Sequence, residues 1–201
     1  MKTNLFHSPP LLENEKIKLI PLEVTHSAAL LEANHPEIWR FMLTEITTLD
    51  EMEQWVTAAI RLREQETALP FAVVLKEQNK IIGSTRLFEI NRSQKSCELG
   101  STWYSKDYQR SFVNSNCKFL ILRYCFETLG MMRVQLKTDE RNLRSQKAIE
   151  RIGAVKEGVL RKERILSGGY VRNAVVYSII DEEWPSIKEG FALRDRNIER
   201  Q

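Results

Sequence analysis

The sequence has little cysteine, no Cys-x-x-Cys pair and no long apolar run. Its three cysteines are odd in number, so neither a disulfide framework nor a zinc site is indicated, and we expect reduced thiols and no metal. No stretch of the chain reaches the length of a membrane span, and the opening MKTNLFHSPP has no apolar core of signal-peptide length. These absences predict a cytoplasmic protein that does not insert into a membrane.

The sequence also lacks a long run of charge of either sign. There are 30 basic and 27 acidic side chains, which leave a net charge of +3. Backbone-driven binding to nucleic acid needs several clustered lysines and arginines, so a nucleic-acid partner is not expected. A small anionic ligand needs only a local site, and the charge balance leaves that open.

Length and composition predict one folded domain. At 201 residues, with 42% hydrophobic and 28% charged residues, the chain can bury a full core but is short for two domains. We expect a flexible N-terminal arm over residues 1–12, a folded domain over 13–185 and a polar C-terminal tail over 186–201. The sequence is compatible with a monomer or a homodimer.

Apolar periodicity and turn residues predict the order of helices and strands. The clearest helix lies within residues 47–66, where Thr48 and Glu51 have capping-box spacing and one apolar face is expected to be core. That face carries Met52, Trp55, Val56, Ala59 and Ile60. Other helices are expected over 27–33 with Thr25 as the cap, from Pro36 through Met42, over 113–129, and over 145–152 with Asn142 as the cap. Strands are expected over 17–23, 71–75, 81–90, 97–105, 133–139, 157–166 and 170–180.

This order predicts an α+β fold with a mixed, mostly antiparallel sheet of about seven strands and flanking helices. The three strands between residues 71 and 105 form a meander, in which neighbours pair antiparallel. The step from strand 97–105 through a helix to strand 133–139 needs a crossover, which favours parallel pairing. A parallel pair in an otherwise antiparallel sheet, beside the start of a helix, is a natural place for a cleft.

The segment from Gln109 to Ser115, QRSFVNS, lies where a strand has ended and a helix begins. Backbone N–H groups at a helix start have no helical acceptors and lie at the positive end of the helix dipole, so a pyrophosphate is an apt ligand. Arg110 and Ser111 add donors. The other interpretation is a polar loop that binds nothing, and the local sequence alone leaves both open.

An ordered series of segments carries a resemblance to a known family. ELGSTWYSKDYQRSFVNS, the helix FLILRYCFE and RVQLKTDERNLRSQKAIERIGAVKEGVLRKERIL are similar to the acetyl-CoA core of the GNAT superfamily of N-acetyltransferases. The opening strand, the WRFM helix and the closing VYSIIDEEWP also fit, so the resemblance covers nearly the whole chain. Within the superfamily, the sequence most resembles the bacterial ribosomal-protein N-terminal acetyltransferase type.

The resemblance implies transfer of an acetyl group from acetyl-CoA, as cosubstrate, to a primary amine on a protein N-terminus or a small molecule. It also implies that the central parallel strands splay apart and that the pantetheine arm lies in the opening like an extra strand. The implied cofactor residues are Thr102, Trp103 and Tyr104 for the pantetheine arm, Gln109, Arg110, Ser111, Phe112, Val113 and Asn114 for the pyrophosphate, and Asn142 and Ser145 near the pantetheine and the sulfur. A hydroxyl near the sulfur can protonate the departing thiolate, so Ser145 is also a catalytic candidate.

The phosphate segment departs from the family pattern at two positions. The family has a glycine, one further residue and then a glycine or alanine, where this chain has Phe112 and Asn114. Glycine keeps side chains away from the phosphate and permits dihedral angles that phenylalanine adopts only at a cost. All eight glycines of the chain lie elsewhere. An alternative function is therefore a non-catalytic module of the same fold that binds CoA weakly or not at all.

Acetyl transfer to an ammonium group requires a base, because the amine must lose a proton before it attacks. Glu98, on the strand that lines the expected cleft, is the first candidate, directly or through water, and Glu163 on a later strand is the second. Ile149 stands where some relatives place a tyrosine, which leaves an acid role to Ser145. A third hypothesis is a thiol enzyme that uses Cys117, against the interpretation of Cys117 as a half-buried helix cysteine.

Overall fold

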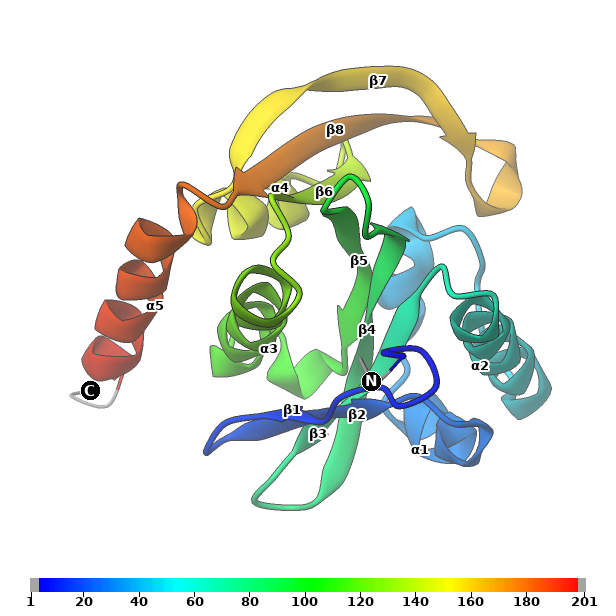
Figure 1. Cartoon of the computed structure of the whole chain (residues 1–201). Coiled ribbons are helices and arrows are strands. Elements are labelled where there is room, and N and C mark those ends of the chain that lie inside the picture. Colours follow the sequence, from blue (N-terminus) through cyan, green and yellow to red (C-terminus); the bar gives the residue numbers. More distant parts are fainter. Residues whose placement is uncertain (1–3, 199–201) are drawn as a thin grey trace.

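The computed structural model describes residues 4–198, and one mixed sheet runs through this part of the chain (Figure 1). Its strand order is β1-β2-β3-β4-β5-β6-β8-β7, and every neighbouring pair is antiparallel except the parallel pair β5–β6. The strands are β1 (Leu12–Glu13), β2 (Ile17–Pro21), β3 (Leu69–Leu75), β4 (Lys80–Asn91), β5 (Ser96–Tyr104), β6 (Arg133–Asp139), β7 (Val155–Ile165) and β8 (Val171–Ile180). The predicted mixed sheet is confirmed, with eight strands instead of about seven because the two-residue β1 adds an edge.

Five α-helices and several short turns of helix flank the sheet. The α-helices are α1 (Ser27–Glu32), α2 (Leu49–Glu64), α3 (Phe112–Arg123), α4 (Leu143–Arg151) and α5 (Trp184–Ile198). The 3-10 turns are η1 (Val24–His26), η2 (Pro36–Phe41), η3 (Lys106–Tyr108) and η5 (Ser167–Gly169), and η4 (Tyr124–Thr128) is a π-helical continuation of α3.

Local capping signals decide where the helices begin. The predicted capping box of α2 is confirmed, because the Glu51 amide donates to Thr48 and the Glu51 carboxylate accepts from the Thr48 amide. The predicted cap Thr25 is wrong. Residues Val24–His26 form the turn η1, which is held by reciprocal contacts of Glu23 and His26, so α1 starts from inside a helical turn and needs no hydroxyl cap.

Two hydrophobic clusters fill the two faces of the sheet. In Figure 1, α1 and α2 lie on one side of β4 while α3 and α5 lie on the other. Because successive strand residues point to opposite faces, Phe71 and Val73 of β3 join the cluster under α3, whereas Ala72 joins the cluster under α1 and α2. The central strands β3 and β4 are therefore buried on both faces, and the cleft described below is bounded by both clusters.

Both ends of the described chain pack against the rest of the domain. Leu5 and Phe6, in the segment that the sequence analysis treats as a flexible arm, are buried in the cluster under α3. The segment expected as a polar tail forms α5, whose Trp184 and Phe191 pack against Phe119 of α3 at ring distances of 6.1 and 5.4 Å. A few apolar side chains at helical spacing are enough to dock a helix that is otherwise polar.

Candidate active site

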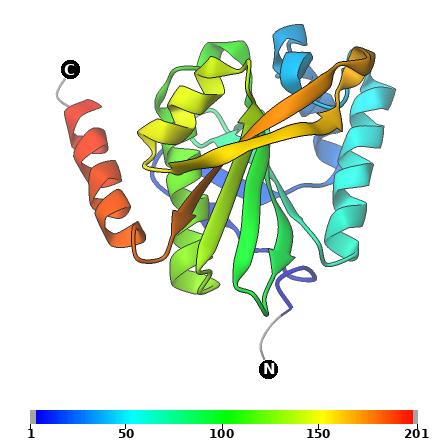
Figure 2. The ribbon, with the colours of Figure 1, turned by 90° about the horizontal axis from the view of Figure 1, so that it is seen from above.

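The parallel strands β5 and β6 pair over only three residues and then separate. The paired positions are Ser96 with Arg133, Cys97 with Val134 and Glu98 with Gln135, and β6 continues beyond them paired with β8 alone. A cleft of about 1040 Å³ opens at this separation. Figure 2 shows the β7–β8 hairpin crossing over the central strands, with α4 on one side and α2 on the other.

A bulge in β5 determines toward which face of the sheet the cleft side chains of this strand point. Ser101 has φ of 45°, and the pairing of β4 with β5 shifts register between Ser84 and Arg86. Thr102 consequently points toward α3, where it accepts a hydrogen bond from Lys118 at 2.8 Å. Trp103 points the other way and packs against Trp55 of α2 at a ring distance of 6.2 Å.

The start of α3 holds the predicted phosphate segment. Ser111 is the N-cap, and its hydroxyl accepts from the Val113 amide at 3.2 Å and donates to the Tyr108 carbonyl at 2.7 Å. The left-handed residue of the loop is Arg110, with φ of 61°. Phe112 is the first residue of the helix and lies outside the left-handed region, so the expectation that its backbone is strained is wrong.

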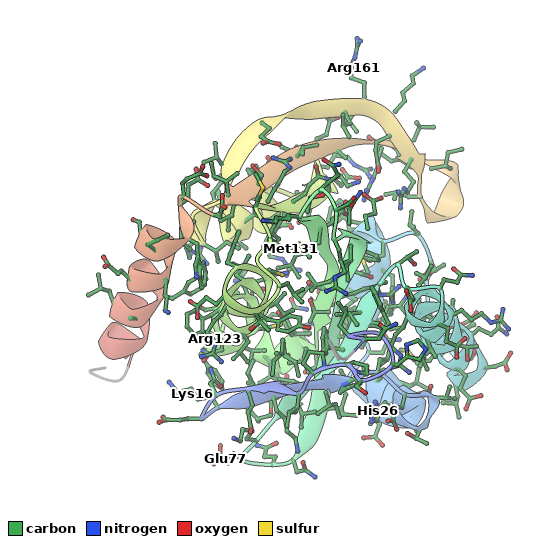
Figure 3. The ribbon with its side chains drawn as sticks, in the orientation of Figure 1. Lys16, His26, Glu77, Arg123, Met131 and Arg161 are labelled. Carbon is green, nitrogen blue, oxygen red and sulfur yellow. The ribbon has the colours of Figure 1, made fainter. Side chains whose placement is uncertain are left out.

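The side chain of Phe112 lines the cleft and also has partners in the core. It is half-buried, packs against the hydrophobic cluster under α3, and lies 5.7 Å from the Lys16 ammonium. Figure 3 labels Lys16 beside β2, on the same side of the sheet as α3. The large side chain in the position of a glycine, which motivated the non-catalytic alternative, therefore has packing partners of its own on the α3 side of the sheet.

Gln109 links the phosphate segment to two other walls of the cleft. Its side-chain oxygen accepts from Arg144 of α4 at 2.7 Å, and its side-chain nitrogen donates to the Tyr104 carbonyl of β5 at 3.2 Å. Arg144 was missed by the sequence analysis, because an exposed arginine early in a helix carries no local signal of a site. It adds positive charge opposite the start of α3.

Asn142 and Ser145 lie together at the start of α4. The Asn142 side chain accepts from the Ser145 amide at 3.1 Å, which confirms Asn142 as the cap of this helix. Both residues are half-buried and line the cleft. The role of Asn142 toward a cofactor and the role of Ser145 as an acid remain predictions.

The two candidate bases, Glu98 and Glu163, both lie close to one lysine. Lys137 of β6 lies 2.9 Å from the Glu98 carboxylate and 3.8 Å from that of Glu163. Glu163 is also paired with Arg172 at 2.9 Å. Burial by itself raises the pKa of Glu163, but the hydrogen bond and charge of Arg172, with Arg164 and Lys137, outweigh it and hold this pKa below its usual value. A carboxylate stabilised in this way accepts a proton poorly, and Glu163 does not line the cleft, whereas Glu98 does.

The structure brings the predicted site residues to one cleft with two exceptions. Those that line it are Glu98, Thr102, Trp103, Tyr104, Gln109, Arg110, Ser111, Phe112, Asn114, Asn142 and Ser145. The exceptions are Glu163 and Val113. The Val113 side chain is fully buried, and its amide donates a hydrogen bond to the Ser111 hydroxyl.

Cys117 lies outside the cleft and is fully buried. Burial raises the pKa of its thiol, and the nearby Lys118 ammonium and the hydrogen bonds of Tyr104 and Thr85 offset that rise only in part. A nucleophilic cysteine needs an accessible thiolate, so the geometry does not favour the thiol-enzyme hypothesis.

The described residues contain neither a candidate membrane span nor a candidate metal cluster. No helix between residues 4 and 198 is long and apolar enough to span a membrane. Over the same residues, no group of three or more histidine, cysteine or acidic side chains is arranged to hold a metal ion.

Comparison with known proteins identifies what the chain is similar to. Residues 16–155 match a family model described as an acetyltransferase (GNAT) domain. The crystal structure of a "putative acetyltransferase" from T. thermophilus is 34% identical with a TM-score of 0.84, covering 92% of this chain and 97% of that chain. Among curated proteins, the "Putative ribosomal N-acetyltransferase YdaF" of Bacillus subtilis (strain 168) is 24% identical over 88% of this chain and 96% of its own length. The microcin C7 self-immunity acetyltransferase MccE, solved in complex with acetyl-CoA and AMP, shares the fold at 21% identity, with a TM-score of 0.73 over 83% of this chain and 93% of that chain.

Proposed function

Because the chain belongs to the GNAT acetyltransferase family, we propose that it transfers the acetyl group of acetyl-CoA to a primary amine by direct attack in a ternary complex. One observation carries the proposal. Strands β5 and β6 stop pairing after Glu98 and Gln135, and the start of α3 lies at the same opening. A cosubstrate with an amide-bearing arm and a pyrophosphate complements both a free strand edge and a helix N-terminus.

The two parts of the cosubstrate match two parts of the cleft. The backbone of Thr102 and Trp103 is the proposed partner of the pantetheine arm, because no pairing of β5 with β6 extends this far in the described sheet. The Tyr104 carbonyl already accepts from Gln109, so it contributes only if that side chain moves. The proposed partners of the pyrophosphate are the amides of the segment from Gln109 to Asn114, with Arg144 adding charge; the Gln109 and Val113 amides already donate to Lys106 and Ser111, so they contribute only if those bonds break.

The chemistry assigned to the residues balances in protons. Glu98, directly or through one water, takes a proton from the acceptor ammonium. The neutral amine then attacks the acetyl carbon, and the nitrogen of the tetrahedral intermediate releases its extra proton to solvent. The C–S bond breaks to leave a neutral amide, and the departing thiolate takes a proton from the Ser145 hydroxyl, which recovers one from solvent. The name of YdaF refers to a ribosomal acceptor for that protein, and for this chain a protein N-terminus and a small-molecule amine are the two candidate acceptor classes.

Two measurements test the proposal. Calorimetric titration with acetyl-CoA should give saturable binding, and a panel of amines should yield at least one acceptor that releases free CoA thiol. The product should be an amide, identified by its mass. Absence of acetyl-CoA binding to the folded protein would overturn the proposal and leave the non-catalytic module.

A further inference from the structure

Arg86 of β4 is a buried cation without a hydrogen-bonding partner in the described structure. It is 7% exposed, and its Nε and Nη2 atoms are covered and donate to nothing between residues 4 and 198. Burial lowers the pKa of Arg86 to about 10. Buried guanidinium groups are normally paired with carboxylates or carbonyls, because an unpaired buried charge is costly. The protein therefore maintains an unfavourable arrangement at this position.

The contacts that Arg86 does make are aromatic. Its guanidinium carbon lies 4.9 Å from the ring centre of Trp55 and 5.4 Å from that of Phe88. Such contacts partly offset the charge, but they satisfy none of the N–H groups. The Nε1 of Trp103, which packs against the same Trp55, is a second buried donor without a partner among the described residues. Two side chains that contact one tryptophan thus both carry donors without an acceptor, which points to a ligand that supplies one.

Arg86 lies on the same face of the sheet as the proposed base. Phe88 pairs with Glu98 across β4 and β5, and Arg86 pairs with Gly100, so Arg86 and Glu98 are diagonal neighbours. Diagonal positions on an antiparallel pair lie about 7 Å apart. Because Gly100 has no side chain, the Phe88 ring and the Glu98 carboxylate approach its backbone, at 3.2 and 3.7 Å from where a Cβ would lie, and both Arg86 and Glu98 line the cleft.

We propose that Arg86 binds a carboxylate of the acetyl acceptor, so that the acceptor is an amine carrying a carboxylate within a few bonds of the reacting nitrogen. The inference rests on the proposed function. The amine lies at Glu98 and the carboxylate at Arg86. A free amino acid and a polypeptide with an acidic first residue both present this chemistry.

The surroundings add an apolar requirement. The cleft walls next to Arg86 come from η2 and α2, and their side chains are Ile38, Phe41, Met42, Trp55, Ala58 and Leu62. These contacts suit an acceptor whose remaining side chain or body is apolar or aromatic. In the search for acceptors, aromatic amino acids are therefore the first compounds to test.

The competing explanation is that Arg86 only supports the fold. The two explanations predict opposite effects of Arg86→Met, which keeps an unbranched apolar stem and removes the charged guanidinium. A residue that is maintained for a ligand can destabilise the folded state. Its replacement should therefore leave the melting temperature unchanged or raise it. A structural arginine would leave the variant less stable.

The first experiment compares matched acceptors by CoA thiol release. L-phenylalanine is measured against L-phenylalaninamide, and a tetrapeptide amide that begins with Glu against one that begins with Gln. The wild-type preference for the carboxylate in one pair should fall roughly 10- to 100-fold in Arg86→Met. Comparing the ratio between proteins cancels the different amine reactivities, and the pair that responds identifies the source of the carboxylate.

Controls separate this role from others. Arg61→Met removes a charge from the exposed side of α2 and should change neither ratio. Arg86→Lys keeps the charge without the forked donor geometry and should give an intermediate ratio. An equal loss on both members of each pair would mean that Arg86 acts through Glu98 or through the fold, and would overturn the proposal. So would an unchanged ratio in both pairs.

The second experiment is independent of turnover. Trp55 and Trp103 line the cleft, so binding of 3-phenylpropionate should change tryptophan fluorescence, whereas 3-phenylpropionamide should bind more weakly. The difference should vanish in Arg86→Met. If acetyl-CoA fails to bind but this difference is found, the proposed function is wrong and the carboxylate site stands. If acetyl-CoA binds and the difference is absent, the carboxylate site is wrong and the proposed function stands.

Discussion

The two faces of strands β4 and β5 each bury one cation, and they treat it differently. On the α3 face, Lys118 donates to Thr102 at 2.8 Å, and Thr102 in turn shares a hydrogen bond with Thr85 at 2.8 Å. On the α2 face, Arg86 contacts two aromatic rings, and its Nε and Nη2 atoms have no acceptor among the described residues. Burial does not explain the difference, since Lys118 is 6% exposed and Arg86 is 7% exposed.

The difference in hydrogen bonding distinguishes a buried polar group that supports the fold from one that binds a ligand. A buried polar side chain that belongs to the scaffold is normally satisfied within the scaffold, as Lys118 is. Arg86 is not satisfied, and it lies beside the proposed base on the side of the cleft that the cosubstrate segments do not occupy. We therefore assign the α3 face to the acetyl donor and the α2 face to the acceptor.

The largest effect should come from Glu98→Gln, which removes the proposed base from the acceptor face. Turnover should fall roughly 100-fold or more, because proton removal contributes rate factors of that size. Acetyl-CoA affinity should stay level, since Glu98 belongs to the other face. The measurement is kcat against pH, together with a calorimetric titration.

The matched control for that prediction is Glu163→Gln. Its carboxylate has a lowered pKa and lies outside the cleft, so turnover should fall less. If the acidic limb of the pH profile persists in Glu98→Gln and disappears in Glu163→Gln, the two roles are reversed.

A second prediction concerns Phe112 on the donor face. Phe112→Gly should lower the free energy of unfolding by about 2 kcal/mol, because it removes a half-buried ring and loosens the first helical residue. Acetyl-CoA affinity should stay level or rise, since the ring packs against the core cluster and Lys16 and supplies no donor to a phosphate. Phe112→Leu, which keeps much of the packing, is the control for stability. Binding of acetyl-CoA by the variant but not by wild type would mean that the ring blocks the site.

A third prediction sharpens the contrast between the two cations. Lys118→Met should lower the free energy of unfolding by roughly 1 kcal/mol at about pH 10, because it removes the hydrogen bond to Thr102. Burial lowers the pKa of Lys118 from 10.5 to about 8, so the folded state disfavours the charged form. Removal of that charge should offset part of the loss below pH 8, and the offset should disappear as pH rises toward 10.5, where the unfolded lysine also loses its proton.

Denaturant titrations of Lys118→Met and wild type at about pH 7 and about pH 10 test the sign. A loss of stability that shrinks as pH rises would contradict the assignment of a burial penalty to Lys118. The carboxylate preference of Lys118→Met is measured as for Arg86→Met. A preference equal to that of wild type would confirm that the two faces act separately, and its loss would contradict this separation.

The smallest effect should come from Asn142→Ala at the start of α4. Loss of the cap should lower the free energy of unfolding by about 1 kcal/mol. Thr48→Ala removes a cap of the same kind from α2 and is the control. Both variants should lose similar stability, but only Asn142→Ala should weaken acetyl-CoA binding. Equal cofactor affinity in the two variants would remove Asn142 from the donor site.

The sequence predicted features whose cause is local. The capping box of Thr48 and Glu51 and the cap at Asn142 need residues only three positions apart, and both are confirmed. The meander and the crossover to β6 follow from strand and helix order, so the mixed sheet with one parallel pair was also predictable. The phosphate segment was located by its place between a strand and a helix, although Val113 proved to be buried.

The features that were missed depend on distant parts of the chain. Trp55 was interpreted as core from its helical spacing, which cannot tell a packed face from a face that borders a cleft. Arg86 sits in a strand buried on both faces, and no neighbour in sequence indicates that it lacks an acceptor. The direction of the Phe112 ring depends on Lys16 and the cluster under α3, far away along the chain.

By itself, then, the sequence determined the helices, the strands, their order and the family resemblance, because periodicity, caps and turn residues act over a few positions. Tertiary structure alone decided what the side chains of the cleft face. The bulge at Ser101 sends Thr102 toward α3 and Trp103 toward α2, and a one-residue shift in a strand exchanges its two faces. Only that folded register leaves Arg86 next to Gly100 with its donors unpaired, since pairing across strands is a property of the sheet and not of either strand.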